Sequence, residues 1–241
     1  MATFHTLRAR YENVLRVDAA QISETQQTWL TQLAAKVDAG ELSLVEATAE
    51  IVEAARGTTS VANLAYQFFT DAVPREAGLD FLVSPTGPNP TNLNSAYYQF
   101  FSTENRYINF AVNLGKVGEG RTGFEADYGG LTLREAAREA YETIFGGAPS
   151  EAFLTLLLDA DVGGGLTRKD YFAVYGGDGL AGLGTKAAMV GWLLTEAAKA
   201  DVGIYARSSN AYLADLADGA QFLVDMVGVY AQPDWAHQPA G

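Results

Sequence analysis

The 241-residue chain contains no cysteine, which excludes disulfide bonds, thiolate zinc sites and a cysteine nucleophile. It has only two histidines, His5 and His237, one near each end of the chain. A histidine acid/base pair or a catalytic triad therefore has no member within the central sequence. Carboxylates are plentiful, but none stands at a spacing that distinguishes it from a solvated helix face. We expect a protein that is not an enzyme and that binds a partner.

Basic residues are few. The 16 lysines and arginines face 29 aspartates and glutamates, which gives a formal net charge of -13 and a pI near 4.5. Such a surface repels phosphate backbones and attracts cations. We therefore expect no nucleic-acid partner and regard a divalent cation as a plausible ligand.

Long hydrophobic runs are also missing. The N-terminal segment is interrupted by Arg8, Arg10 and Glu12 before an apolar stretch can form, so it does not have the pattern of a Sec-type signal peptide. The longest apolar stretch, residues 187–194, is too short to cross a bilayer and includes Gly191. If the protein is exported, we expect a route that needs no N-terminal signal.

Helix signals recur along the chain and predict an all-α, bundle-like domain of many helices. Three pairs have the spacing of a capping box: Ser23 with Gln26, Ser43 with Glu46, and Thr132 with Glu135. Glycines stand where helices should end: Gly40, Gly57, Gly115, Gly129, Gly130, Gly146 and Gly147. Apolar residues follow the 3.6-residue period of a helix in two stripes: Phe4, Leu7, Tyr11, Val14 and Leu15, and then Val61, Leu64, Ala65, Phe68 and Phe69. Convincing strands are hard to find, and residues 222–230 can be read as a strand or as a buried helix.

Composition divides the chain into an N-terminal helical subdomain, residues 1–57, and a larger helical domain, residues 58–241, that holds the aromatic-rich and glycine-rich sequence. A weak repeat relates two helix-turn-helix segments at an offset of 75 residues. The matching residues are Ala65, Tyr66, Pro74, Glu76, Ala77, Leu79 and Leu82 in the first segment, and Ala140, Tyr141, Pro149, Glu151, Ala152, Leu154 and Leu157 in the second. An ancient duplication and chance convergence of two similar motifs both account for this pattern.

The glycine-rich segment at residues 177–182 matches the G-x-G-x-x-G pattern of dinucleotide-binding turns. No alternation of strands and helices surrounds it, and the preceding residues read as the end of a short helix. We therefore expect a flexible connection in a glycine-rich chain, not a nucleotide site.

One acidic loop has a spacing similar to that of an EF-hand. Asp159, Asp161 and Asp170 fall at positions 1, 3 and 12 of the loop, whereas Gly163 offers no side-chain ligand at position 5. These three aspartates are the predicted ligands of a Ca²⁺ ion. The alternative is a simple linker, in which Thr167 caps the next helix together with Asp170.

The most unusual predicted helix carries three asparagines, Asn105, Asn109 and Asn113, at every fourth residue along one face. Asparagine is unfavourable inside helices, so this stripe needs an explanation. One explanation is structural: the amides satisfy the backbone of neighbouring loops. The other is a sugar-binding surface, in which amides bond hydroxyl groups beside aromatic rings. The further residues predicted for that surface are Tyr97, Tyr98, Arg106 and Tyr107.

Four sequence blocks in the same region resemble a known family. They are Ala65-Tyr-Gln-Phe-Phe-Thr, Ala77-Gly-Leu-Asp-Phe-Leu, Leu93-Asn-Ser-Ala-Tyr-Tyr and Glu104-Asn-Arg-Tyr-Ile-Asn-Phe. They are similar to the N-terminal domain of Caulobacter-type S-layer proteins and related alphaproteobacterial surface proteins. The similarity is strong over residues 58–145 and remains collinear from the Tyr11 region to about Gly219.

The resemblance implies a helical anchoring domain that binds the O-antigen polysaccharide of lipopolysaccharide with the help of calcium. It also implies an extracellular location on the outer-membrane surface, without insertion and after a type I-like export. The glycine- and aspartate-rich repeats of the family's lattice-forming part are absent, so we expect an anchoring module alone. A helical protein-protein interaction module of a secreted surface protein is the alternative. Self-association or another surface-layer protein would then supply the partner.

Overall fold

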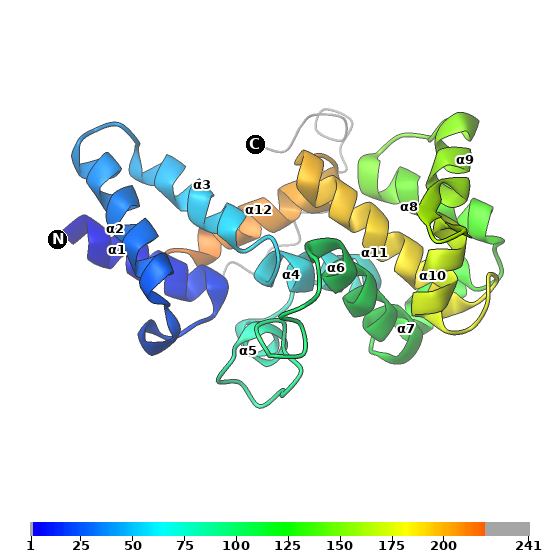
Figure 1. The fold of residues 1–241 in the computed structure, drawn as a ribbon, viewed down its shortest axis with the longest axis horizontal. Coiled ribbons are helices and arrows are strands. Elements are labelled where there is room, and N and C mark those ends of the chain that lie inside the picture. The colour runs from blue at the N-terminus through cyan, green and yellow to red at the C-terminus, as the bar shows by residue number, and fades with distance from the viewer. Residues whose placement is uncertain (1, 220–241) are drawn as a thin grey trace. The chain divides into compact units, whose positions relative to one another are not determined.

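The computed structural model describes residues 2–219, and over these residues the chain is mainly helical, with twelve α-helices and one two-stranded hairpin (Figure 1). The prediction of an all-α fold is confirmed. Residues 222–230, which the sequence left ambiguous, and His237 lie outside the described residues.

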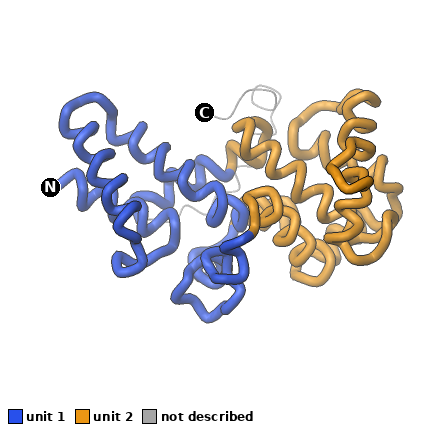
Figure 2. The backbone as a smooth tube through the Cα atoms, in the orientation of Figure 1, with its two compact units in different colours: residues 1–63, 74–100, 209–224 blue, residues 64–73, 101–208, 225–241 orange. Residues whose placement is uncertain are grey.

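The chain folds into two compact units (Figure 2). Among the described residues, unit 1 comprises 2–63, 74–100 and 209–219, and unit 2 comprises 64–73 and 101–208. The first three helices of the predicted N-terminal subdomain thus belong to the same unit as two later segments. The domain boundary at residue 57, which was predicted from composition, stays a prediction.

Unit 1 is built on three helices whose ends the sequence marked. Its elements are α1 (Ala2–Leu15), the 3-10 helix η1 (Ala19–Gln21), α2 (Glu24–Asp38), α3 (Leu44–Ala54), the beginning of α4 (Thr59–Thr70), α5 (Glu76–Val83) and most of α12 (Ile204–Leu216). Ser23 and Ser43 each close a capping box, as predicted. The α1 stripe is buried at Leu7, Tyr11 and Val14, so the apolar period that predicted this helix also supplies the unit's core.

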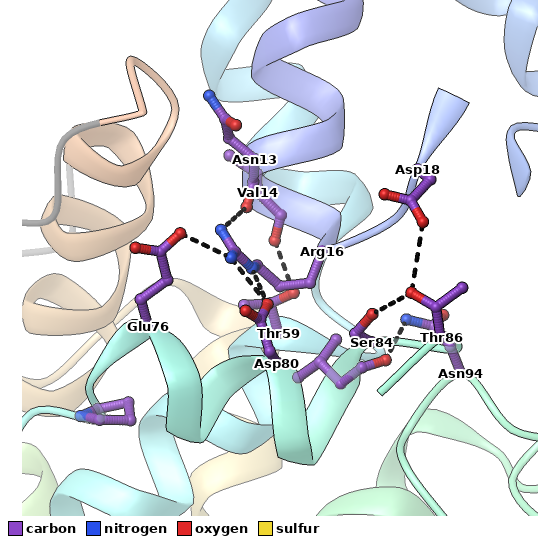
Figure 3. Close-up of polar contacts among 12 residues, drawn as sticks. Asn13, Val14, Arg16, Asp18, Thr59, Glu76, Asp80, Ser84, Thr86 and Asn94 are labelled. Carbon is purple, nitrogen blue, oxygen red and sulfur yellow. Dashed lines mark hydrogen bonds and ion pairs between the residues drawn. The ribbon is translucent and has the colours of Figure 1, made fainter. Parts of the chain in front are cut away.

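Arg16, which follows α1, ties this helix to α5 (Figure 3). Its Nε donates to Asp80 Oδ1 at 2.7 Å, and an Nη donates to Glu76 Oε1 at 2.9 Å. Another Nη bonds the Asn13 carbonyl at 3.2 Å, which returns the side chain to the end of its own helix. Arg16 adopts a φ of 56°, a left-handed conformation that is costly for a residue with a Cβ. The ion pairs and the helix end therefore hold a conformation that the backbone alone disfavours.

The loop between α5 and residue 100, rich in proline and asparagine, is organised by its own amides. Asn94 Nδ2 donates to the Val83 carbonyl at 2.9 Å, and Thr86 Oγ1 donates to Asp18 Oδ2 at 3.3 Å (Figure 3). The Leu93 backbone N–H also bonds the Leu82 carbonyl at 2.9 Å. These bonds fold the loop back onto α5 and the start of unit 1.

Unit 2 surrounds one long helix. Its elements are the end of α4, α6 (Thr103–Val112), the π-helix η2 (Asn113–Val117), α7 (Arg121–Tyr128), α8 (Leu133–Phe145), α9 (Glu151–Asp159), β1 (Asp161–Gly163), β2 (Leu166–Thr167), α10 (Arg168–Gly176), α11 (Leu183–Ala200) and the beginning of α12. Helix α11 contacts α6, α10 and α8, and most of its residues are buried. A helix that is apolar around most of its circumference has to be the centre of its bundle.

A buried lysine in α11 joins the central helix to α7. Lys186 is 1% exposed, and its Nζ donates to the carbonyls of Tyr128 and Gly129, each at 2.9 Å. These carbonyls end α7 and have no helical partner of their own. The ammonium group therefore caps α7 from inside the core, while burial lowers the pKa of Lys186 below its ordinary value.

The two helix-turn-helix segments related by sequence also correspond in their element bounds. Shifting α4 and α5 by 75 residues places them on residues 134–145 and 151–158, close to the observed bounds of α8 and α9. The residue after the first helix of each segment is left-handed, at Asp71 with φ 52° and at Gly146 with φ 75°. Arg75 and Ser150, also 75 residues apart, are both extended N-caps. The weak repeat is thus a repeat of local backbone structure as well as of sequence.

Candidate functional site

Helix α6 presents the asparagine stripe of unit 2. Ser102 caps its N-terminus by accepting from the Asn105 N–H at 3.2 Å. Tyr107 and Ile108 are buried on the face that packs against α11. Asn105 and Asn109 are partly exposed, and Asn113 is exposed. The buried face of α6 therefore fixes the rotation that turns the asparagines outward.

The asparagines form two separate hydrogen-bonded groups. Asn105 Oδ1 accepts from the Tyr171 hydroxyl of α10 at 2.5 Å, and Asn113 Nδ2 donates to Asn109 Oδ1 at 3.2 Å. The ring of Tyr171 lies edge-on to that of Tyr175, with centroids 5.1 Å apart. These five residues belong to α6, the π-helix η2 and α10 of unit 2, and they carry no formal charge. We call them the amide/tyrosine strip.

The raised pKa of the Tyr171 hydroxyl keeps this group neutral near neutral pH. Burial raises its pKa well above the ordinary value of 10.0, and its hydrogen bond to Tyr175 raises it further. A neutral phenol can donate to Asn105, whereas a phenolate cannot. The strip therefore contains no acidic or basic side chain, and the Tyr171 hydroxyl in it is neutral as well.

A π-helix follows directly after α6 and begins at Asn113. The Gly118 N–H bonds the Asn113 carbonyl at 2.7 Å, five residues back, and there is no room for a Cβ at Gly115, where it would meet the ring of Phe69 at 2.4 Å. Gly115 was predicted to end a helix. Instead it lies inside the π-helix, where only a residue without a Cβ fits beside the ring of Phe69. Short π-helical turns occur often at functional sites.

Lys116, inside the π-helix, joins this segment to α10. Its Nζ donates to the Gly176 carbonyl at 2.6 Å and lies 3.6 Å from Asp178 Oδ2. The ammonium thus caps the C-terminus of α10, where the helix dipole favours a cation. Both ends of the strip are consequently tied to α10, at Asn105 and at Lys116.

Asp178, within the glycine-rich segment at 177–182, caps the N-terminus of α11. Its carboxylate accepts from the N–H groups of Gly184 at 2.7 Å and Thr185 at 3.2 Å. These are the N-terminal amides of α11 that a bound phosphate would otherwise use. The expectation that this is not a nucleotide site agrees with the structure. The connection is held by its own cap, however, and is more ordered than a flexible linker.

A scan against protein-family models matched residues 58–238 to the RsaA N-terminal domain. This chain belongs to the RsaA N-terminal domain family. The match covers about three quarters of the chain and includes every residue of the strip. A search of curated proteins found no match.

Membership of this S-layer domain family places the chain in a structural family of cell-surface proteins. None of the helices within residues 2–219 is both long and apolar enough to cross a membrane.

The residues predicted for sugar binding divide between the two units. Tyr97 and Tyr98 belong to unit 1, whereas Arg106, Tyr107 and the three asparagines belong to unit 2. Tyr97 is 49% exposed, but Tyr98 is buried beneath it with the ring centroids 4.9 Å apart. Tyr107 is fully buried and Arg106 partly so. Of the predicted aromatic residues, Tyr97 alone offers a substantial exposed ring.

Sequence reasoning did not single out Tyr171 and Tyr175. A signal existed, because tyrosines four residues apart on a helix share one face. It gave no reason to place them beside Asn105, which lies 66 residues earlier. Phe100, in unit 1 and 89% exposed, was likewise not singled out.

The three predicted calcium ligands are each engaged elsewhere. Asp159 Oδ1 pairs with Lys169 Nζ at 2.6 Å, and Asp161 Oδ1 accepts from the Gly163 N–H at 2.7 Å. Asp170 closes a capping box with Thr167, as the alternative reading expected, and these hydrogen bonds lower its pKa. Within residues 2–219 no group of three or more acidic or histidine side chains is placed to hold a metal ion. A calcium site at these three aspartates stays a prediction.

Proposed function

We propose that this protein is a non-catalytic anchoring domain that binds the O-antigen polysaccharide of lipopolysaccharide on the outer-membrane surface. The observation that carries the proposal is the family match over residues 58–238, which makes the chain a member of an S-layer domain family. A domain that holds a surface layer in place needs a ligand on the cell that it covers. The ligand that the family resemblance implies is the O-antigen polysaccharide, the outermost part of lipopolysaccharide.

The charge of the protein supports a sugar over an anionic lipid group as the direct contact. A net charge of -13 opposes close approach to an anionic outer leaflet, unless the contact is neutral or cations bridge the two surfaces. The amide/tyrosine strip offers the neutral contact. We propose that calcium assists by screening and bridging the remaining negative charges, with no role assigned to the loop of Asp159.

Binding to defined lipopolysaccharide tests this function. The full chain is incubated with purified smooth lipopolysaccharide, which carries O-antigen, and with rough lipopolysaccharide, which lacks it. Retention on the smooth form alone, reduced by a calcium chelator, is the expected result. Equal retention on both forms would exclude the O-antigen as the ligand, and retention unchanged by chelator would exclude calcium assistance.

Docking of another surface-layer protein is a second candidate function. It is favoured by exposed apolar side chains on α9 and the hairpin of unit 2, where Leu156, Val162 and Leu166 are 62%, 41% and 42% exposed. Exposed apolar groups of this kind are typical of protein contacts. Recovery of a defined protein partner without any glycan would favour this function over polysaccharide anchoring.

A further inference from the structure

We propose that the amide/tyrosine strip of unit 2 is a binding site for an uncharged, hydroxyl-rich saccharide, in which Asn113 and Tyr175 contact the sugar directly. Tyr171 and Asn105 act as positioning residues in this site. The inference rests on the proposed function, because it names the surface that would contact the polysaccharide.

Asn113 distinguishes the functional from the structural explanation of the asparagine stripe. Asn105 has a structural role, because it accepts a hydrogen bond from Tyr171 between two packed helices. Asn113 is exposed, and its side-chain amide donates to the partly exposed amide of Asn109 and not to a buried backbone group. Since asparagine is unfavourable in helical backbone, its place here is better explained by a ligand than by the fold.

The surrounding structure holds Asn113 in place. Its backbone carbonyl accepts the π-helical bond from Gly118, and the next turn is locked by Gly115 against Phe69 and by Lys116 against the end of α10. A side chain on such a fixed backbone loses little freedom when it binds a ligand. The π-helix therefore prepares Asn113 for contact with a ligand.

Tyr175 supplies the aromatic part of the site. Its ring is partly exposed and lies edge-on to Tyr171, whose hydroxyl is held by Asn105. The apolar face of a sugar ring packs on an aromatic ring, while adjacent amides bond the hydroxyl groups at its edge. A phenol and two amides together match this two-sided chemistry of a saccharide.

Two lysines beside the strip are paired with carboxylates, which favours a neutral ligand. Lys199 lies 3.5 Å from Glu104 and 2.8 Å from Glu196, and Lys116 lies 3.6 Å from Asp178. These lysines and carboxylates satisfy one another and are therefore less available to a charged sugar. We therefore expect selectivity for uncharged residues of the polysaccharide.

The test compares variants of the full chain in binding to O-polysaccharide released from smooth lipopolysaccharide by mild acid. Tyr175→Ala and Asn113→Ala are each expected to raise the Kd about tenfold, the size of effect that follows from losing one good contact. Tyr175→Phe keeps the ring and is expected to stay within about threefold of the wild type. Val174→Ala is the matched control, because Val174 is 69% exposed on the same helix and lies outside the strip.

The outcomes separate this inference from the proposed function. If the wild type prefers smooth to rough lipopolysaccharide, yet Tyr175→Ala and Asn113→Ala bind as well as Val174→Ala, the strip is not the site and the proposed function stands. If the wild type shows no preference, both are overturned. Far-UV circular dichroism checks that each variant is folded, and Asn113→Ala, at an exposed position, gives a reading even if Tyr175→Ala does not fold.

Discussion

Gly191, at the crossing of α6 and α11, provides the sharpest test of how unit 2 is packed. A Cβ added there would lie 2.6 Å from the Tyr107 carbonyl oxygen, 2.8 Å from Ile108 Cα and 2.9 Å from Ala111 Cβ. Two of these three atoms belong to the backbone of α6, so no rotation of a flexible side chain can make room. Gly191→Ala therefore has to push α6 away from α11.

The expected effect is the difference between two opposing contributions. Overpacking costs about 3 kcal/mol when backbone has to move, at the upper end of the usual range. Replacing glycine by alanine within a helix returns about 1 kcal/mol. We expect Gly191→Ala to lower the free energy of unfolding by about 2 kcal/mol. Because α6 carries the strip, we also expect weaker binding of the polysaccharide.

Gly123→Ala is the matched control in the same unit. Gly123 lies within α7, is exposed, and has no heavy atom within 4 Å of an added Cβ. Here only the helix contribution remains, so the variant is expected to be more stable than the wild type by about 0.5 to 1 kcal/mol. Urea unfolding followed by circular dichroism measures both variants. If Gly191→Ala is as stable as Gly123→Ala, the close crossing of α6 and α11 is refuted.

Three further predictions concern polar groups. Arg16→Ala should lower the stability of unit 1 by about 1 to 2 kcal/mol, measured by urea unfolding. Arg16→Gly should lose about 1 kcal/mol less, because glycine accepts the left-handed φ of 56°, and equal losses would contradict this role of the backbone. Arg56→Ala, which removes a partly exposed arginine from a local ion pair, is the control. Hydrogen bonds from Thr132 hold the pKa of Glu135 below its ordinary value of 4.5, so its stabilisation is complete above that pH and is lost as the pH falls through the lowered pKa. The acid-induced loss of stability, measured by thermal unfolding between about pH 5 and pH 3, should then be smaller in Glu135→Gln, and an unchanged pH profile would argue against the cap. Finally, the double variant of Asp159→Asn with Asp161→Asn should keep any calcium-induced rise in Tm, because these carboxylates are engaged elsewhere; a lost calcium response would restore the hairpin as the metal site.

Much of the fold could be predicted from the sequence because its signals act over one or two helical turns. The capping boxes at Ser23, Ser43 and Thr132 form as their spacing indicated, since the cap and its partner are three residues apart. The stripe of α1 is buried for the same local reason. The resemblance to the S-layer family was likewise readable from contiguous blocks, and the family match confirms it.

The candidate site, in contrast, was decided by contacts between distant segments. Whether an outward asparagine meets solvent or another helix depends on what packs beside it, and Asn105 meets Tyr171 across 66 residues of sequence. Burial of Tyr98 and Tyr107 and the wide turn at Gly115 have the same origin, because each is set by the volume that neighbouring side chains occupy. The sequence alone determined an acidic, helical, cysteine-free domain with an asparagine stripe. Only the tertiary structure decided which tyrosines accompany that stripe and that the predicted tyrosines of residues 97 and 98 belong to the other unit.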